Sequence, residues 1–149
     1  MTRRHFAALV LVLVLAGCAD RDKDIKPVIP PLPAETMQRA EAGDAAAQFK
    51  LAEHYLATES DDPQRMLGWL RKSAERGYPL AQTSLGVLYL AGDSVPLDRI
   101  EAYAWFYLAS GQNETSAIEL EGMLNIDLSD EEIRQALELA RHHTTVSKP

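Results

Sequence analysis

The sequence predicts an all-α fold, a short solenoid of antiparallel helix pairs, and three observations support this prediction. Residues 43–56 resemble residues 77–90 at a constant offset of 34 positions, which indicates an internal repeat. Apolar residues inside both segments lie four apart, so they line one face of a helix. The segments that follow also align, at an offset of 36, and the two-residue difference falls where a loop would join two helices.

The first helix of each pair comes from these two aligned segments. Six of their 14 positions carry the same residue: Gly43/Gly77, Ala47/Ala81, Gln48/Gln82, Leu51/Leu85, Tyr55/Tyr89 and Leu56/Leu90. A small residue also recurs, as Ala52 and Gly86, and would let a neighbouring helix approach closely. We therefore expect first helices over residues 44–57 and 78–91.

The second helix of each pair begins at an aspartate and contains a tryptophan. The aligned residues are Asp62/Asp98 and Trp69/Trp105. Asp62 is followed by Pro63, and this order is typical of a helix N-terminus. The predicted second helices span residues 62–76 and 97–110.

Partial units are expected at both ends of the array. Residues 40–43 echo residues 74–77, so a short helix near residues 34–42 is predicted to be the end of an earlier unit. After the second pair, Ala117 keeps the phase of the repeat, but Glu121 and Asn125 replace the expected leucine and tyrosine. This third unit is degenerate, as expected of a cap.

A last helix is predicted over residues 129–143. Ser129 and Glu132 have the spacing of a capping box, which marks a helix N-terminus. An apolar stripe at i, i+3, i+4 and i+7 follows, made of Ile133, Ala136, Leu137 and Ala140. We expect this helix to close the apolar end of the stack.

The second pair carries the pattern of a known repeat family. Its pattern residues are Ala81, Gln82, Leu85, Gly86, Tyr89, Asp98, Ala102 and Trp105, followed by the small pair Ala109 and Ser110. This pattern resembles the Sel1-like repeats, relatives of the tetratricopeptide (TPR-like) repeats, and the resemblance covers about residues 35–143. It implies a right-handed α/α solenoid. The chain departs from the family pattern at Met66, where the family has alanine, and at Ser94, where it usually has glycine.

The N-terminus has the pattern of an exported lipoprotein. Arg3 and Arg4 precede an uncharged apolar run over residues 6–16, which is too short to span about 30 Å of hydrocarbon as a helix. The run fits the apolar part of a secretory signal. Residues 15–18, Leu-Ala-Gly-Cys, then resemble the lipobox of bacterial lipoproteins.

That resemblance implies a signal peptide over residues 1–17, which is removed, and a palmitate-type acyl modification on Cys18. Acyl chains on one residue give an effectively permanent membrane anchor. Ala19 and not an aspartate follows the cysteine, which favours the outer membrane over the inner one, with the protein in the cell envelope facing the periplasm. An uncleaved anchor or a chance match are the alternatives.

The rest of the chain divides into a tether, a repeat domain and a tail. Residues 18–34 contain four prolines and are expected to form an extended tether of about 3.1 Å per residue, or an ordinary disordered leader. Residues 35–143 form the predicted repeat domain. Residues 144–149 are expected to be a disordered tail.

Charge and motifs exclude several classes of function. The net charge is −7, and without Arg3 and Arg4 it becomes −9, so binding to nucleic-acid backbones is not expected. The sequence has no HExxH motif, no paired CxxC motif, no Gly-x-Ser-x-Gly elbow and no phosphate-binding glycine loop. We therefore expect no enzyme activity, catalytic residue, metal, cofactor or small-molecule substrate.

Six side chains are candidates for contact with a protein partner. Glu53, His54, Val87 and Leu88 lie off the core face of the first helices. Tyr103 and Tyr107, at i and i+4, lie beside the core face of the last helix of the second pair. These two tyrosines either pack on the third unit or belong to a binding surface.

The sequence therefore favours a lipid-anchored module that binds and organises another protein in the cell envelope. A repeat array presents an extended surface that suits protein segments better than it suits chemistry. An inhibitor or sensor of an envelope enzyme remains an alternative, and a cell-wall-active hydrolase is a further one.

Overall fold

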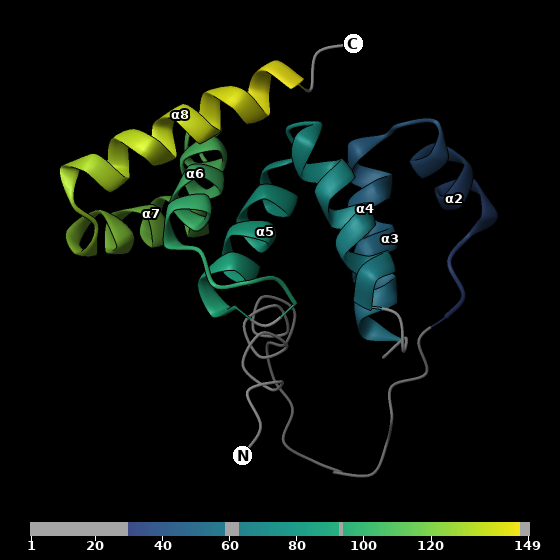
Figure 1. The fold of residues 1–149 in the computed structure, drawn as a ribbon. Coiled ribbons are helices and arrows are strands. Elements are labelled where there is room, and N and C mark those ends of the chain that lie inside the picture. Colours follow the sequence, from purple (N-terminus) through teal and green to yellow (C-terminus); the bar gives the residue numbers. More distant parts are fainter. Residues whose placement is uncertain (1–29, 59–62, 93, 147–149) are drawn as a thin grey trace, which may run out of the picture.

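Helices make up all the regular structure in the computed structural model, which describes residues 30–58, 63–92 and 94–146 (Figure 1). Helices contain 79% of these described residues, and no strand occurs among them. The helices are α2 (Ala34–Glu41), α3 (Ala45–Ala57), α4 (Pro63–Glu75), α5 (Pro79–Ala91), α6 (Arg99–Ser110), α7 (Thr115–Asp127) and α8 (Asp130–Val146). The predicted all-α fold is confirmed.

The helices from α2 to α7 stand side by side in chain order, and α8 lies across one edge of the array (Figure 1). The most extensive packing joins α3 to α4 and α5 to α6, which are the two predicted pairs. Packing of α4 on α5, and of α6 on α7, stacks one unit on the next. Stacking supplies each pair with the apolar cover that two helices cannot provide alone.

Aspartate caps and glycine turns begin several of the helices. The Asp44 carboxylate accepts a hydrogen bond from the backbone amide three residues later (2.9 Å). The Asp98 carboxylate accepts bonds from two amides in the first turn of α6 (3.0 Å each). Gly43 and Gly77 precede the first helices with positive φ angles of 95° and 83°, a conformation that favours glycine. The predicted cap at Asp62 lies outside the described residues.

A buried glutamine joins each first helix to the helix before it. Gln48 Nε2 donates to the carbonyl oxygen of Ala40 (3.0 Å), and Gln82 Nε2 donates to that of Ala74 (3.1 Å). Both glutamines are buried, and a buried carbonyl without a partner costs free energy. These repeated bonds fix the stacking of successive units. They also show that α2 occupies the position of a second helix, as predicted.

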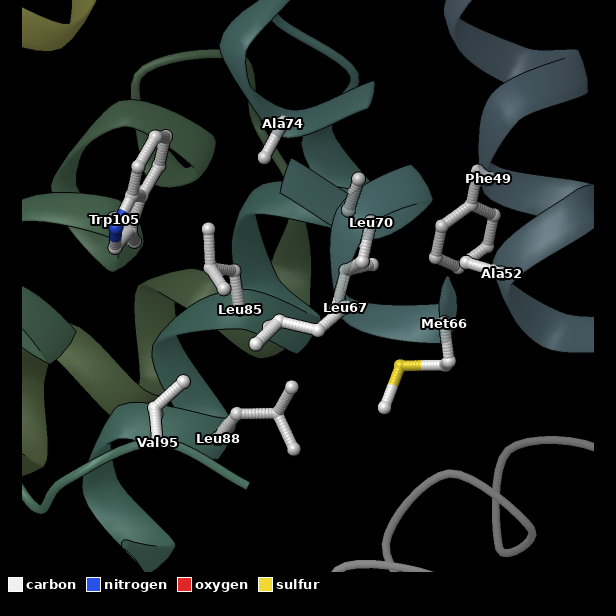
Figure 2. Close-up of a cluster of buried hydrophobic side chains, with 11 residues drawn as sticks. Phe49, Ala52, Met66, Leu67, Leu70, Ala74, Leu85, Leu88, Val95 and Trp105 are labelled. Carbon is white, nitrogen blue, oxygen red and sulfur yellow. The ribbon is translucent and has the colours of Figure 1, made fainter. Parts of the chain in front are cut away.

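Apolar side chains from α3, α4, α5 and α6, together with Val95 of the α5–α6 loop, form the first core (Figure 2). Its residues are Phe49, Ala52, Met66, Leu67, Leu70, Ala74, Ala81, Leu85, Leu88, Val95 and Trp105. A second core joins α6, α7 and α8 through Ala102, Tyr103, Ala104, Phe106, Leu124, Leu128, Ala136 and Ala140. A third, smaller core holds Ala40, Ala47 and Leu51 between α2 and α3.

A small residue lets each first helix approach its second helix closely. A Cβ atom on Gly86 would lie 2.6 Å from Cε1 of Phe106 and 3.1 Å from the carbonyl oxygen of Ala102. Ala52 has the equivalent place in the first pair and belongs to the same core as Leu70, the residue that aligns with Phe106. The predicted close approach at both positions is therefore confirmed.

The capping box at the start of α8 is confirmed. The Ser129 amide donates to Glu132 Oε2 (2.8 Å), and the Glu132 amide lies 3.4 Å from Ser129 Oγ. The hydrogen bonds from Ser129 hold the pKa of the Glu132 carboxyl below its usual value. The predicted apolar stripe also packs in the second core, with Ala136 and Ala140 fully buried.

The last helix extends further than predicted, because residues 144–146 continue α8. The assignment of these residues to a disordered tail is wrong, and residues 147–149 lie outside the described part. His143 explains the extension. Its ring stacks on Trp105, with ring centroids 4.1 Å apart and planes 20° apart, and its Nε2 lies 3.0 Å from Glu101 Oε2. These contacts hold the end of α8 against α6.

The direction of α8 differs from that of α4 and α6 in the complete pairs. Its main packing partner is α6, and its far end reaches α4, whereas its contacts with α7 are sparse. The third unit therefore does not close into a hairpin. None of the helices in the described ranges combines the length and apolar character needed to cross a bilayer.

Two glycine substitutions should have opposite effects on stability. Gly86→Ala places a methyl group against the Phe106 ring and the backbone, and we expect a loss of about 1–3 kcal/mol of unfolding free energy. Gly122→Ala is the matched control, since no heavy atom lies within 4 Å of a Cβ there, and we expect a gain of about 0.5–1 kcal/mol. Urea unfolding of the two variants measures both values, and equal losses would contradict the packing described.

The contacts of His143 should anchor the end of α8. His143→Ala removes the ring that stacks on Trp105, and we expect faster amide hydrogen exchange in the last turns of α8 together with a loss of about 1 kcal/mol. Arg141→Ala is the control, because its ion pair with Glu138 is exposed and surface pairs contribute little. Equal exchange rates in the two variants would show that His143 does not hold the helix.

Candidate partner-binding surface

Leu88 is not a surface residue, and its assignment as a contact for a partner is wrong. Its side chain is buried in the first core, together with Val95 and Leu67 (Figure 2). A first helix in a stack is covered both by its own second helix and by the preceding one. Residues outside the Leu/Tyr face are therefore buried as well, which the pattern of a single helix does not reveal.

Tyr103 is also buried, and of the two alternatives for it, packing on the third unit is correct. Its hydroxyl lies 3.4 Å from Glu121 Oε1 and 3.4 Å from Asn125 Oδ1. The Ser110 hydroxyl donates to the same glutamate. Burial, and next the charge of Glu121, raise the pKa of the Tyr103 hydroxyl. The polar residues that make the third unit degenerate are thus partners of this tyrosine.

The remaining predicted contacts differ in exposure and lie on different helices. Glu53 and His54 on α3, and Val87 on α5, are half-buried, and Val87 packs against the second core. Burial raises the pKa of the Glu53 carboxyl, and the charge of Lys50 opposes this effect. Tyr107 on α6 is 45% exposed and is available to a partner. A role of these four residues in binding stays a prediction.

The largest apolar exposure that sequence reasoning missed is on α7. Ile118 is 49% exposed, Met123 is 66% exposed and Ile126 is 84% exposed. Ile118, Gly122 and Ile126 lie at i, i+4 and i+8, so they share one side of the helix, and Met123 lies beside them. We call these four residues the open face of α7.

Comparison with the complete pairs explains why this face is open. Gly122 aligns with Gly86, the position where α5 receives Phe106 of its second helix. No atom lies within 4 Å of a Cβ built on Gly122, although the small residue is retained. In the second pair, Val87 and Leu90 align with Met123 and Ile126 and pack against the core that contains Phe106. Gly122, Met123 and Ile126 therefore correspond to the side of α5 that packs on α6, whereas Ile118 aligns with Gln82. In the third unit, α8 packs on α6 instead.

The link between α7 and α8 sets this direction. Only Leu128 and Ser129 separate the two helices, and Leu128 is extended (φ −93°, ψ 145°) with its side chain buried in the second core. The capping box then begins α8 at once. Because Leu128 is held in the core, α8 starts beside α6 and its apolar stripe is buried there.

The surroundings of the open face are acidic. Residues 113–133 contain seven acidic residues and no lysine, arginine or histidine. Glu119 is exposed on the same side of α7, between Ile118 and Met123 in sequence. Asp127 forms an ion pair with Arg99 of α6 (2.8 Å), although both side chains remain largely exposed. The surface thus combines exposed apolar residues with an excess of negative charge.

No site for a metal emerges from the described residues, since they contain no group of three or more His, Cys, Asp or Glu side chains placed to hold an ion. The predicted lipidation site, Cys18, lies outside the described residues. The arrangement that the structure does provide is a helical surface for binding.

Comparisons with known proteins agree with the repeat architecture. The family profile described as Sel1 repeat matches residues 45–78 and 79–114. The structure is similar to that of a Sel1 repeat protein from Oxalobacter formigenes, with a TM-score of 0.58 and 23% identity over 70% of this chain and 96% of that one. A comparison with curated proteins gave no match.

A second solved structure is similar over most of the chain. It is a protective antigen present in uropathogenic Escherichia coli strains that displays an SLR fold, with a TM-score of 0.66 and 27% identity. The similarity covers 95% of this chain but only 30% of the antigen, so the chain spans less than a third of that protein. The pairs α3–α4 and α5–α6 therefore match the Sel1 repeat profile, and the chain is an all-α helical repeat solenoid similar to structures of the SLR fold.

Proposed function

We propose that this protein is a lipid-anchored scaffold of the bacterial cell envelope that binds another protein through the open face of α7. Sel1 repeats generally mediate protein–protein interactions, which supports a binding role. The observation that carries the proposal is the exposure of Ile118, Met123 and Ile126 on one helix. Exposed apolar patches of this kind mark interaction sites.

The energetics of this face favour association. Complete burial of one isoleucine or methionine side chain contributes about 1.5–3 kcal/mol. Ile126 and Met123 are mostly exposed in the isolated chain, so a partner that covers them gains most of that contribution. The gain must exceed the entropy lost on association, which favours a partner that buries the whole face and not one residue.

The lipid anchor rests on the N-terminal sequence. Arg3 and Arg4, the apolar run and the lipobox-like residues 15–18 support export and acylation of Cys18. An outer-membrane anchor, followed by the proline-rich residues 18–34, would present the repeat domain to proteins of the periplasm. Anchoring also restricts the search for a partner to the membrane surface, which raises the effective concentration of both proteins.

Loss of the cysteine should release the protein from the membrane. We expect that Cys18→Ser abolishes incorporation of labelled palmitate, because the serine hydroxyl does not replace the thiol in acylation. The variant should leave the membrane fraction, or should accumulate as a precursor that keeps its signal peptide. Ala19→Ser is the control, and it should leave labelling unchanged. Palmitate incorporation in the Cys18→Ser variant would contradict the anchor.

A photo-crosslinker on the open face should capture the partner in cells. We expect crosslinks from position 123, where the side chain is 66% exposed, and none from position 75 on α4, which serves as an exposed control. Mass spectrometry of the crosslinked species identifies the protein attached. Crosslinks from Tyr107 in place of Met123 would move the binding surface to α6 and contradict this proposal.

A further inference from the structure

We propose that the segment bound by the open face of α7 is a basic amphipathic helix of the partner protein, which occupies the position of a second helix in the third repeat. This inference rests on the proposed function and specifies the chemistry of the partner. It follows from the geometry of the two complete pairs and from the charge around α7.

The repeat geometry indicates that the bound segment is a helix. In the second pair, the residues of α5 that align with Gly122, Met123 and Ile126 pack against the core that contains Phe106 of α6. The backbone of α7 continues the same arrangement, since Ala117 is fully buried like Ala81. A helix from another protein could therefore cover the open face of α7 as α6 covers the aligned side of α5.

Gly122 indicates a bulky apolar anchor on that helix. Gly86 lies against the Phe106 ring in the second pair, and Ala52 shares a core with Leu70, the residue that aligns with Phe106, in the first. Gly122 preserves the same space, and no atom of the described chain fills it. A leucine or phenylalanine of the partner would fit there, between Ile118 and the exposed end of α7.

The charge around α7 indicates that the polar side of the bound helix is basic. Residues 113–133 contain seven acidic residues and no basic residue, although Asp127 pairs with Arg99 and Glu131 pairs with Arg134. Glu119 is exposed beside the apolar stripe. Lysine or arginine residues at the edges of the bound helix would pair with these carboxylates, whereas acidic residues would be repelled.

Other occupants fit less well. The end of α8 is held on α6 by His143, and its apolar stripe is already buried. The exposed side of α2 carries Glu35, Gln38 and Arg39, so a second copy would not offer an apolar helix through that end of the array. An anionic lipid surface would be repelled by the acidic residues near α7.

A designed peptide tests the chemistry directly on the full, purified protein. The peptide has about 18 residues, with leucine along one helical face and lysine elsewhere. Two controls have the same length: one with the same composition in scrambled order, and one with glutamate in place of lysine. We expect at least ~10-fold tighter binding of the basic amphipathic peptide than of either control, and weaker binding at high salt. Equal binding of the scrambled or acidic peptide would overturn the inference.

Matched protein variants locate the binding site. Gly122→Trp places a bulky side chain on the open face of α7, at a position where a Cβ atom meets no atom within 4 Å. We expect at least ~10-fold weaker binding of the basic peptide, because the tryptophan occupies the space of the bound helix. Gly68→Trp on α4 is the control, because its Cβ also meets no atom within 4 Å, and it should bind like the unmodified protein. Glu119→Lys should weaken binding at low salt and have little effect at high salt. Unchanged binding in Gly122→Trp would place the peptide elsewhere and contradict the inference.

Crosslinking from position 126 in cells separates this inference from the proposed function. A crosslink to a basic amphipathic helix of another protein supports both. A crosslink to an acidic or non-helical segment of another protein overturns the inference but leaves the proposed function in place. A crosslink to a second copy of this chain overturns the inference as well. The absence of any protein crosslink from positions 123 and 126 overturns both.

Discussion

Close contact between a small residue on the first helix and a bulky residue on the second controls the architecture of this chain. Ala52 lies in one core with Leu70, and Gly86 receives the Phe106 ring at a distance that excludes a side chain. This contact brings the two helices of a pair close enough for their larger residues to interdigitate. The buried hydrogen bond of Gln82 then ties each pair to the helix before it, so that pairing and stacking reinforce each other.

In the third unit, the helix that follows α7 packs on α6 and not on α7. Leu128 enters the second core at the end of α7, and α8 buries its apolar stripe on α6 and its His143 ring on Trp105. A helix cannot cover α6 in this way and also cover the outer side of α7. The burial gained on α6 therefore leaves Ile126 exposed, and the open face of α7 is a consequence of the packing of α8 on α6.

Much of the fold could be predicted because helix periodicity and caps are local. The cap at Asp98 and the capping box at Ser129 are recognised from a few neighbouring residues. The burial of Leu88, in contrast, depends on residues of other helices that are distant in sequence. Periodicity identifies the most apolar side of a helix, but it does not show how many neighbours cover the other sides. The open face was missed because the apolar stripe of α8 could pack either on α6 or on α7. Which of the two packs better depends on tertiary contacts that the sequence pattern does not show. One signal was present: Ile118 stands where the second repeat has its buried glutamine.

The accessibility of α7 in the isolated protein tests the central claim most directly. Single cysteines at positions 126 and 124, each in a Cys18→Ser background, can be compared by their rates of reaction with a maleimide reagent. The structure predicts that the cysteine at position 126 reacts almost as fast as a cysteine in a short peptide, while the one at position 124 is protected, since Ile126 is 84% exposed and Leu124 is 4% exposed. Protection at both positions would show that α8 covers α7, and the account of an unpaired first helix would be wrong.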